Sequence, residues 1–319
     1  MDHLSFIENK PAQKTKISIV PIPLDIGSDN TNMSTAPKYL LKLGLQNVLE
    51  NNGFKVSVLP QIYTPKKSSA KMTKDQALKE ILKVIKDSNK AVKGEILKGN
   101  KVLSIGGDHA IAIGTIGGAA EALKGDLGLI WIDAHGDLNT HETSPSGNVH
   151  GMSSAILLGF GDKKLDGLVK NKIKKENILF IGLKDLDQPE IDRIRKNKLS
   201  AITMFDIMMH GFPLIAEKVQ SLKKRVNNIW ITMDLDSVEK SDAPASAMAT
   251  SGGLTYREVT NLLSYIGRTT NVVGLDIVEV TPNSDINNKT GRLCIELVAE
   301  AFGTKYNWYS EYMHHYEGK

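Results

Sequence analysis

The chain has 319 residues, 41% of them hydrophobic, and a formal net charge of +4. This composition is sufficient for a large core, and the lysines are scattered along the chain instead of forming the basic cluster typical of a nucleic-acid interface. No apolar run approaches the roughly 20 residues that span a bilayer. We therefore expect neither a nucleic acid nor a membrane as a partner.

The single cysteine and the first residues of the chain indicate in which cellular compartment the protein is found. Cys294 has no second cysteine to pair with and lies in the apolar run RLCIELVAEAF, so we expect a buried, inert thiol in a reducing compartment. The opening residues, MDHLSFIENKPAQKTK, contain no apolar segment typical of a secretory signal. We expect a cytoplasmic protein.

Short apolar runs typical of β-strands recur along the chain. They are KISIVPIPL (16–24), FKVSVLP (54–60), KVLSI (101–105), LGLIWI (127–132), NILFIGL (177–183), NIWITM (228–233) and NVVGLDIVEV (271–280). Most of them lack polar alternation, which indicates strands that are covered on both faces.

Helical patterns lie between these runs. Thr73 and Gln76 form the signature of a capping box at the start of a long helical segment, and further helices are expected at 110–123 and 256–266. Strands that alternate with helices predict a mainly parallel sheet of the α/β class. The chain shows no internal repeat, low-complexity tract or linker, so we predict one domain over residues 1–319.

Side chains suited to metal binding or catalysis follow four of the predicted strands. They are His109 in GGDHA, Asp133, His135 and Asp137 in DAHGD, Asp234 and Asp236 in MDLD, and Glu279 in IVEV. Because ligands bind beyond the carboxyl ends of parallel strands, we expect these residues to meet at one edge of the sheet. Strand side chains alternate between faces, so Asp133 and His135 should point the same way, and so should Asp234 and Asp236.

Carboxylates that converge in this way would repel one another unless a cation were bound. Two imidazoles and four carboxylates are too many ligands for one tetrahedral zinc ion and suit two ions with bridging carboxylates. Oxygen ligands favour manganese or a similar ion, and two such ions about 3.5–4 Å apart form a hydrolytic centre. A single Asp or His is more often a cap, a turn residue or a structural residue, but the combination at three strand ends favours metal.

The motifs GGDH, DAHGD and MDLDSVEKSDAPASAMATSGGLTYRE resemble the signature regions of the ureohydrolases, the family of arginases and agmatinases. The resemblance extends from about Val102 to the C-terminus. It implies a three-layer α/β/α sandwich and two Mn²⁺ ions per subunit, with another divalent ion such as Co²⁺ as the alternative. It places His109, Asp133, Asp137 and Asp234 around one ion, and His135, Asp133, Asp234 and Asp236 around the other.

Within this family, the segment DLNTHETSPSGNVHG is most similar to arginases, which implies hydrolysis of L-arginine to L-ornithine and urea. Asn139, Ser146 and Asn148 match positions that recognise the α-carboxylate of the substrate. Asp187 matches a residue that helps to bind the α-ammonium group, and Glu190 lies nearby in the sequence.

The resemblance also implies three catalytic roles. Glu279 matches the carboxylate that orients the guanidinium group, and His150 matches a histidine that acts as proton shuttle or acid/base. Asp137 would accept a proton from the attacking hydroxide and pass it to the departing amine. We interpret two further features as having no chemistry: His141 as a solvent-facing loop residue and the Met208–Met209 pair as packing residues.

The chain departs from the family pattern around the predicted substrate site. The family usually has a glycine-rich segment, often with arginine, where this chain has DIGSDNTNMSTAPKYL and keeps only Pro37 in register. An Asp-Pro pair of the family is replaced by Glu239–Lys240, and a small hydroxyl residue is replaced by Met248. The alternatives are therefore another ureohydrolase (agmatinase, guanidinobutyrase or formimidoylglutamase) or a binding paralogue without activity. By family analogy we also expect a homo-oligomer, either a trimer or a hexamer.

Overall fold

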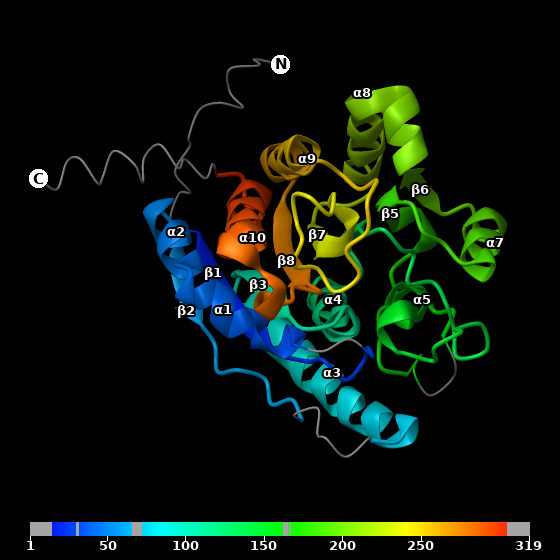
Figure 1. Ribbon diagram of the computed structural model, residues 1–319, viewed down its shortest axis with the longest axis horizontal. Helices are drawn as coiled ribbons and strands as arrows, with labels where there is room; N and C mark the ends of the chain where they lie inside the picture. The colour runs from blue at the N-terminus through cyan, green and yellow to red at the C-terminus, as the bar shows by residue number, and fades with distance from the viewer. Residues whose placement is uncertain (1–14, 30–31, 66–71, 162–164, 166, 305–319) are drawn as a thin grey trace, which may run out of the picture.

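Eight parallel strands form the central sheet, as seen in a computed structural model that describes residues 15–29, 32–65, 72–161, 165 and 167–304 (Figure 1). The spatial order is β2-β1-β3-β8-β7-β4-β5-β6. The strands are β1 (Lys16–Ile22), β2 (Lys55–Val58), β3 (Lys101–Gly106), β4 (Gly128–Ile132), β5 (Ile178–Leu183), β6 (Ser200–Thr203), β7 (Ile229–Asp234) and β8 (Val272–Val278). The N-terminal segment 1–14, where no secretory signal was found, lies outside the described residues, as does the C-terminal end of the predicted domain.

Helices cover both faces of this sheet. They are α1 (Ala36–Lys42), α2 (Leu45–Asn51), α3 (Lys74–Leu97), α4 (Ile111–Ala122), α5 (Ser153–Leu158), α7 (Gln188–Asn197), α8 (Met204–Lys223), α9 (Tyr256–Thr269) and α10 (Lys289–Ala301). One apolar core lies under α1, α2, α8, α9 and α10, and a second lies under α3, α4 and α5. This arrangement confirms the predicted α/β/α sandwich.

Alternation along the strands supplies both cores. In β4, Leu129 and Trp131 pack into the second core, whereas Ile130 and Ile132 pack into the first. Both faces of the strand are therefore apolar, which explains the continuous hydrophobic runs in the sequence. Cys294 is buried in the first core, as expected.

The capping box predicted at α3 is confirmed. The Thr73 hydroxyl accepts a hydrogen bond from the backbone N–H of Gln76, and Gln76 Oε1 accepts one from the Thr73 N–H (2.9 Å). These bonds fix the start of α3 at Lys74. No helix among the described residues is both long and apolar enough to cross a membrane.

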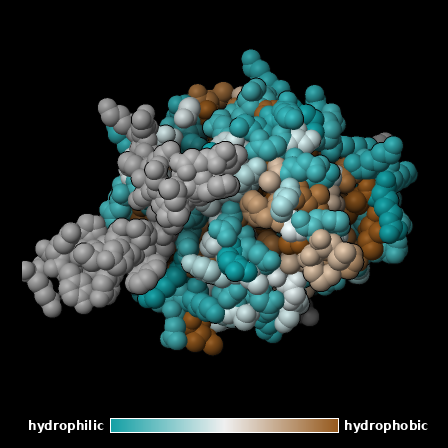
Figure 2. All heavy atoms as spheres, turned by 90° about the horizontal axis from the view of Figure 1, so that it is seen from above, coloured by the Kyte–Doolittle hydropathy of each residue, from teal (hydrophilic) through white to brown (hydrophobic). Residues whose placement is uncertain are grey.

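The exposure of His141 confirms one prediction, and the exposure of Met208 and Met209 contradicts another. His141 is exposed, as expected, with 52% of its side-chain surface accessible. Met208 and Met209 are also exposed, at 69% and 57%, so their interpretation as packing residues is wrong for the described chain. Figure 2 shows that hydrophobic side chains also gather in part of an otherwise hydrophilic face.

Candidate metal and substrate site

The predicted site residues gather beyond the carboxyl ends of β3, β4, β7 and β8. Strand alternation does not explain this convergence, because β4 ends before Asp133 and β8 ends before Glu279. Backbone turns bring the side chains together instead. Asp137 and Glu279 adopt left-handed φ angles of 49° and 61°, and Asp236 lies in a 3-10 turn in which its N–H donates to Asp234 Oδ1 (2.9 Å).

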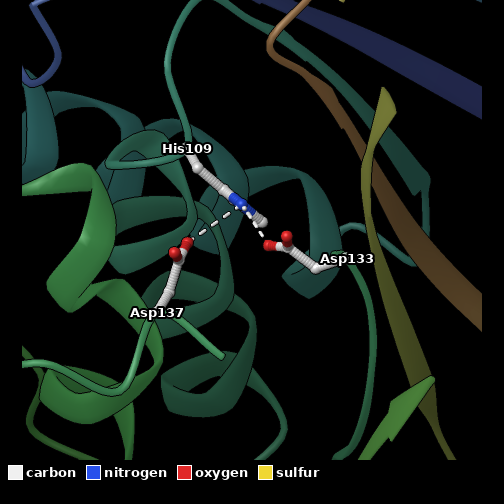
Figure 3. Close-up of side chains that lie close together, drawn as sticks. All are labelled: His109, Asp133 and Asp137. Carbon is white, nitrogen blue, oxygen red and sulfur yellow. Dashed lines mark ion pairs between the residues drawn. The ribbon is translucent and has the colours of Figure 1, made fainter. Parts of the chain in front are cut away.

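His109 lies at the centre of a first group of side chains (Figure 3). Its Nδ1 lies 3.1 Å from an oxygen of Asp133 and 3.1 Å from an oxygen of Asp137. An oxygen of Asp234, at the end of β7, lies 3.3 Å from the same nitrogen. All four side chains are buried. Because one imidazole nitrogen carries at most one proton, it cannot donate to three carboxylates.

His135 and Asp236 form a second group, to which Asp133 also belongs. His135 Nδ1 lies 3.0 Å from Asp236 Oδ2 and 3.5 Å from Asp133 Oδ1. Asp133 therefore directs one oxygen toward each histidine. In the His109–Asp133–Asp137 group and in this second group, the possible ligand atoms lie within 4.8 Å of one another, so each group could hold a metal ion.

Burial and mutual repulsion act on the carboxylates of the two groups. Burial, followed by the charges of Asp236 and Asp133, raises the pKa of Asp234 well above its ordinary value. Burial and the charge of Asp133 raise the pKa of Asp236 to about 6. Burial by itself lowers the pKa of His109, but the surrounding carboxylates raise it well above its ordinary value. The cluster is therefore suited to a bound cation.

A divalent ion fits the first group. His109 Nδ1 and Asp137 Oδ2 are buried and have no hydrogen-bond partner among the described residues, although they lie 3.1 Å apart. Adjacent ligand atoms of an octahedral ion at about 2.1 Å lie about 3 Å from one another, which matches this spacing. Imidazole nitrogen together with carboxylate oxygen is a donor set that Mn²⁺ and related ions accept.

Two residues that the sequence prediction missed hold His109 in place. Thr232 Oγ1 lies 2.9 Å from His109 Nε2, the ring nitrogen that does not face the carboxylates. The Trp131 ring stacks on the imidazole with centroids 4.4 Å apart, and its Nε1 donates to Asp133 Oδ2 (2.9 Å). Each precedes a site aspartate, Asp133 or Asp234, by two residues. Thr232 and Asp234 both lie in β7, so the period of two in a strand could have identified Thr232. Asp133 lies beyond the end of β4, so the same rule gives no such signal for Trp131.

Glu279 lies beside the cluster with only one of its oxygens engaged. Oε1 accepts a hydrogen bond from the backbone N–H of His109 (2.9 Å) and lies 3.3 Å from His150 Nδ1. Oε2 is buried and has no hydrogen-bond partner within the described part of the chain. Burial lowers the pKa of His150, but the pairing with Glu279 outweighs this effect and raises the pKa to about 9. Glu279 can therefore offer an oxygen to a cationic ligand.

A cavity of about 210 Å³ lies over these groups. The predicted site residues that line it are His135, Asp137, Asn139, Ser146, His150, Asp187, Glu190, Asp234, Asp236 and Glu279. His109 and Asp133 are fully buried and do not line the cavity, and neither does Asn148. Met248 also lines the cavity and is 45% exposed. A larger hollow of about 810 Å³ between α8 and α9 contains none of the predicted site residues.

Predicted substrate residues on one wall of this cavity are bonded to one another. Asn139 Nδ2 donates to Asp187 Oδ2 (2.8 Å). Glu190 accepts from the backbone N–H groups of Leu138 and Asp187, both at 3.0 Å. Because both Glu190 oxygens bind the backbone, we expect this residue to position Asp187 instead of contacting a substrate. Burial raises the pKa of Glu190 to about 7.

Part of the loop 144–148 also lines the cavity, through Ser144, Pro145 and Ser146, and the same loop carries Asn148. Ser146 Oγ accepts a hydrogen bond from the Asn148 N–H (3.2 Å). Asn148 Nδ2 donates to Asp29 Oδ2 (2.9 Å), and Lys74 Nζ donates to the Ser146 carbonyl. The two charged partners come from segments far from the loop in sequence, and no sequence signal had indicated either of them.

Comparisons with a family model, with curated sequences and with solved structures all match this chain to arginases. The sequence model of the Arginase family matches residues 15–303. An arginase of Bacillus caldovelox is 36% identical over 296 residues, which cover 91% of this chain and 98% of that protein. The solved native structure of Bacillus caldovelox arginase has a TM-score of 0.87 and 34% identity, covering 92% of this chain and 100% of that chain. Entamoeba histolytica arginase, solved in complex with L-ornithine, has a TM-score of 0.86 and 27% identity at the same coverage.

Proposed function

We propose that this chain, which belongs to the arginase family, is a manganese-dependent arginase that hydrolyses L-arginine to L-ornithine and urea. One observation carries the proposal. Two imidazole–carboxylate groups that share Asp133 lie at one cavity edge with Glu279, whose Oε2 is buried and unpartnered among the described residues. Such a site combines a place for divalent cations with an anionic acceptor for a guanidinium group.

The residues that would hold the metal are those of the two groups. His109 and Asp137 would bind one Mn²⁺ ion, His135 and Asp236 would bind the other, and Asp133 would bind both. Asp234 would be the second shared ligand, since its Oδ2 lies 3.3 Å from His109 Nδ1. What the ions supply when bound is a water molecule of lowered pKa, so that a nucleophile is available at neutral pH.

Glu279 would hold the guanidinium group of the substrate. A guanidinium is a planar cation with five N–H donors, and a carboxylate is its best partner. The contacts of Oε1 with the His109 N–H and with His150 fix the Glu279 side chain, which leaves Oε2 for the substrate. The guanidinium carbon would then lie beside the two carboxylate–imidazole groups, where positioning lowers the barrier to attack.

Asp137 and His150 would move the protons of the reaction. Water adds to the guanidinium carbon, and the bond from that carbon to the side-chain nitrogen of arginine breaks. Asp137 takes a proton from the attacking water and delivers it to the departing nitrogen, which becomes the amine of ornithine. His150 lines the cavity and is partly exposed, so it can exchange a proton with solvent.

The zwitterionic end of arginine would bind at the outer part of the cavity. Asp187 is an anion and would bind the α-ammonium group, with Glu190 behind it. Asn139, Ser146 and Asn148 are neutral donors and would bind the α-carboxylate. Agmatine lacks this carboxylate, so the second N–H of each amide, beside those bound to Asp187 and Asp29, would have no substrate group to bind. L-arginine is therefore the proposed substrate.

A substrate panel tests the proposal. The protein is stripped with a chelator, reloaded with Mn²⁺ and assayed for urea release from L-arginine, agmatine and guanidinobutyrate, with metal content measured in parallel. We expect two Mn²⁺ per chain, activity only after reloading, and the highest kcat/KM with L-arginine. A higher kcat/KM with another guanidino compound would indicate a different ureohydrolase. If none of them releases urea, release of formamide from formimidoylglutamate would indicate a formimidoylglutamase, and no product from any substrate would indicate a binding paralogue.

A further inference from the structure

The loop 144–148 is flanked by two opposite charges. Asp29, from the segment after β1, accepts the hydrogen bond from Asn148 Nδ2 at 2.9 Å. Lys74, the first residue of α3, donates from Nζ to the Ser146 carbonyl. Neither Asp29 nor Lys74 is among the residues that line the cavity, so any effect on a substrate passes through the loop or through space.

Asp29 binds the side chain that is proposed to contact the α-carboxylate of the substrate. The amide nitrogen of Asn148 carries two N–H donors, of which Asp29 takes one. Two acceptors bound to the two donors of one amide lie about 5 Å apart. A substrate carboxylate on the second donor would therefore lie close to a like charge, and Asp29 would weaken its binding.

Lys74 has the opposite sign and lies close against the same loop. Gly147, which has a left-handed φ of 68°, passes so near to this lysine that a Cβ atom on it would lie 2.8 Å from Nζ. The ammonium group thus brings a positive charge to the backbone between Ser146 and Asn148. It would attract the carboxylate that Asp29 repels.

We infer that Asp29 and Lys74 set the discrimination between guanidino substrates with and without an α-carboxylate, Asp29 acting against the carboxylate and Lys74 in its favour. The inference rests on the proposed function and names two specificity residues for it.

L-arginine and agmatine form a matched pair of probes, because they differ only in the carboxylate. Asp29→Asn retains an acceptor for Asn148 and removes the charge, and Lys74→Met removes the other charge at similar length. Coulomb repulsion at about 5 Å in water corresponds to about a four-fold change in KM, and a lower dielectric enlarges it. We expect Asp29→Asn to lower the KM for L-arginine at least four-fold and Lys74→Met to raise it by a similar factor.

Agmatine supplies the internal control. Its KM should change less than two-fold in both variants, and the double variant should return the ratio of the two KM values toward that of the parent. The effects should shrink as salt is raised from about 0.02 M to about 0.5 M, since exposed charges are screened. Glu217→Gln and Lys83→Met, which remove exposed charges of the same types elsewhere, should change neither KM.

Two outcomes would overturn the inference. Equal changes for both substrates, or a higher KM for L-arginine in Asp29→Asn, would mean that these residues only position the loop.

Calorimetric binding of L-arginine and agmatine in an Asp137→Asn background separates the inference from the proposed function. If the parent releases no urea but the binding constants shift as described, the function is wrong and the selectivity stands. If urea is released and the ratio does not move, the selectivity is wrong and the function stands.

Discussion

Replacing Thr232 by valine tests whether the contact behind His109 controls metal affinity. Valine has nearly the shape of threonine and lacks only the hydroxyl group. The hydroxyl lies 2.9 Å from His109 Nε2, and both side chains are completely buried. The substitution therefore leaves the packing in place and removes the hydrogen-bonding partner of the His109 ring nitrogen that faces away from the carboxylates.

The expected loss of Mn²⁺ affinity in Thr232→Val can be estimated in two ways. A buried polar group left without a partner costs about 1–3 kcal/mol. Removal of a hydrogen bond that orients a metal-binding histidine lowers metal affinity about 10–100-fold, which is about 1.4–2.7 kcal/mol. The two ranges overlap, so we expect the apparent Kd for Mn²⁺ to rise by one to two orders of magnitude.

The assay measures urea release as a function of the free Mn²⁺ concentration. As a second measurement, the protein that a chelator has freed of metal is titrated with Mn²⁺ in a calorimeter. The Val variant should recover most of its activity at saturating Mn²⁺, because the proposed catalytic side chains are intact. Thr232→Ser keeps the hydroxyl and should bind Mn²⁺ within a few-fold of the parent. Parent-like affinity in the Val variant, or inactivity that excess Mn²⁺ does not rescue, would refute the orienting role of Thr232.

Further substitutions test other parts of the structure. Asp137→Asn should abolish urea release while thermal unfolding stays close to that of the parent, and an active variant would refute the proton transfer assigned to Asp137. In the metal-free protein, the pKa of Glu190 is raised to about 7 from its ordinary 4.5, so its stabilising contribution is complete below about pH 4.5 and is lost as pH rises through 7. Glu190→Gln should remove this loss, at most about 3 kcal/mol, from urea-denaturation curves measured between pH 4.5 and 8, and an unchanged pH slope would contradict it. Gly274→Ala places a methyl group on the Trp230 ring and should lower the free energy of unfolding by about 1–3 kcal/mol, whereas a neutral result would show that the ring moves aside at no cost.

The fold was predictable because strands buried on both faces leave long apolar runs in the sequence. Runs such as LGLIWI and NIWITM predicted β4 and β7 almost to the residue. The short edge strand β6, with the sequence SAIT, has no such run and was missed. The kink in α8, where Gly211 leaves the helical conformation ahead of Pro213, was also not anticipated.

The sequence predicted that the side chains of the site converge, but it did not predict how the backbone brings them together. Asp133, His135 and Asp137 do converge, yet strand alternation was the wrong reason, since the strand has ended by Asp133 and φ at Asp137 is left-handed. Contacts between distant segments had no local signal at all. The bond from Asn148 to Asp29 joins residues 119 positions apart, and only the folded chain reveals it.

The left-handed backbone at Asp137 and Glu279 has a consequence for how this protein can change. This conformation costs an ordinary L-residue roughly 1–2 kcal/mol, a penalty that glycine avoids. Glycine at either position would relax the main chain and also remove a buried acid. A glycine substitution at Asp137 or Glu279 would therefore raise thermal stability and remove a proposed catalytic side chain at the same time. A screen for thermostable variants that does not measure urea release would select variants without activity.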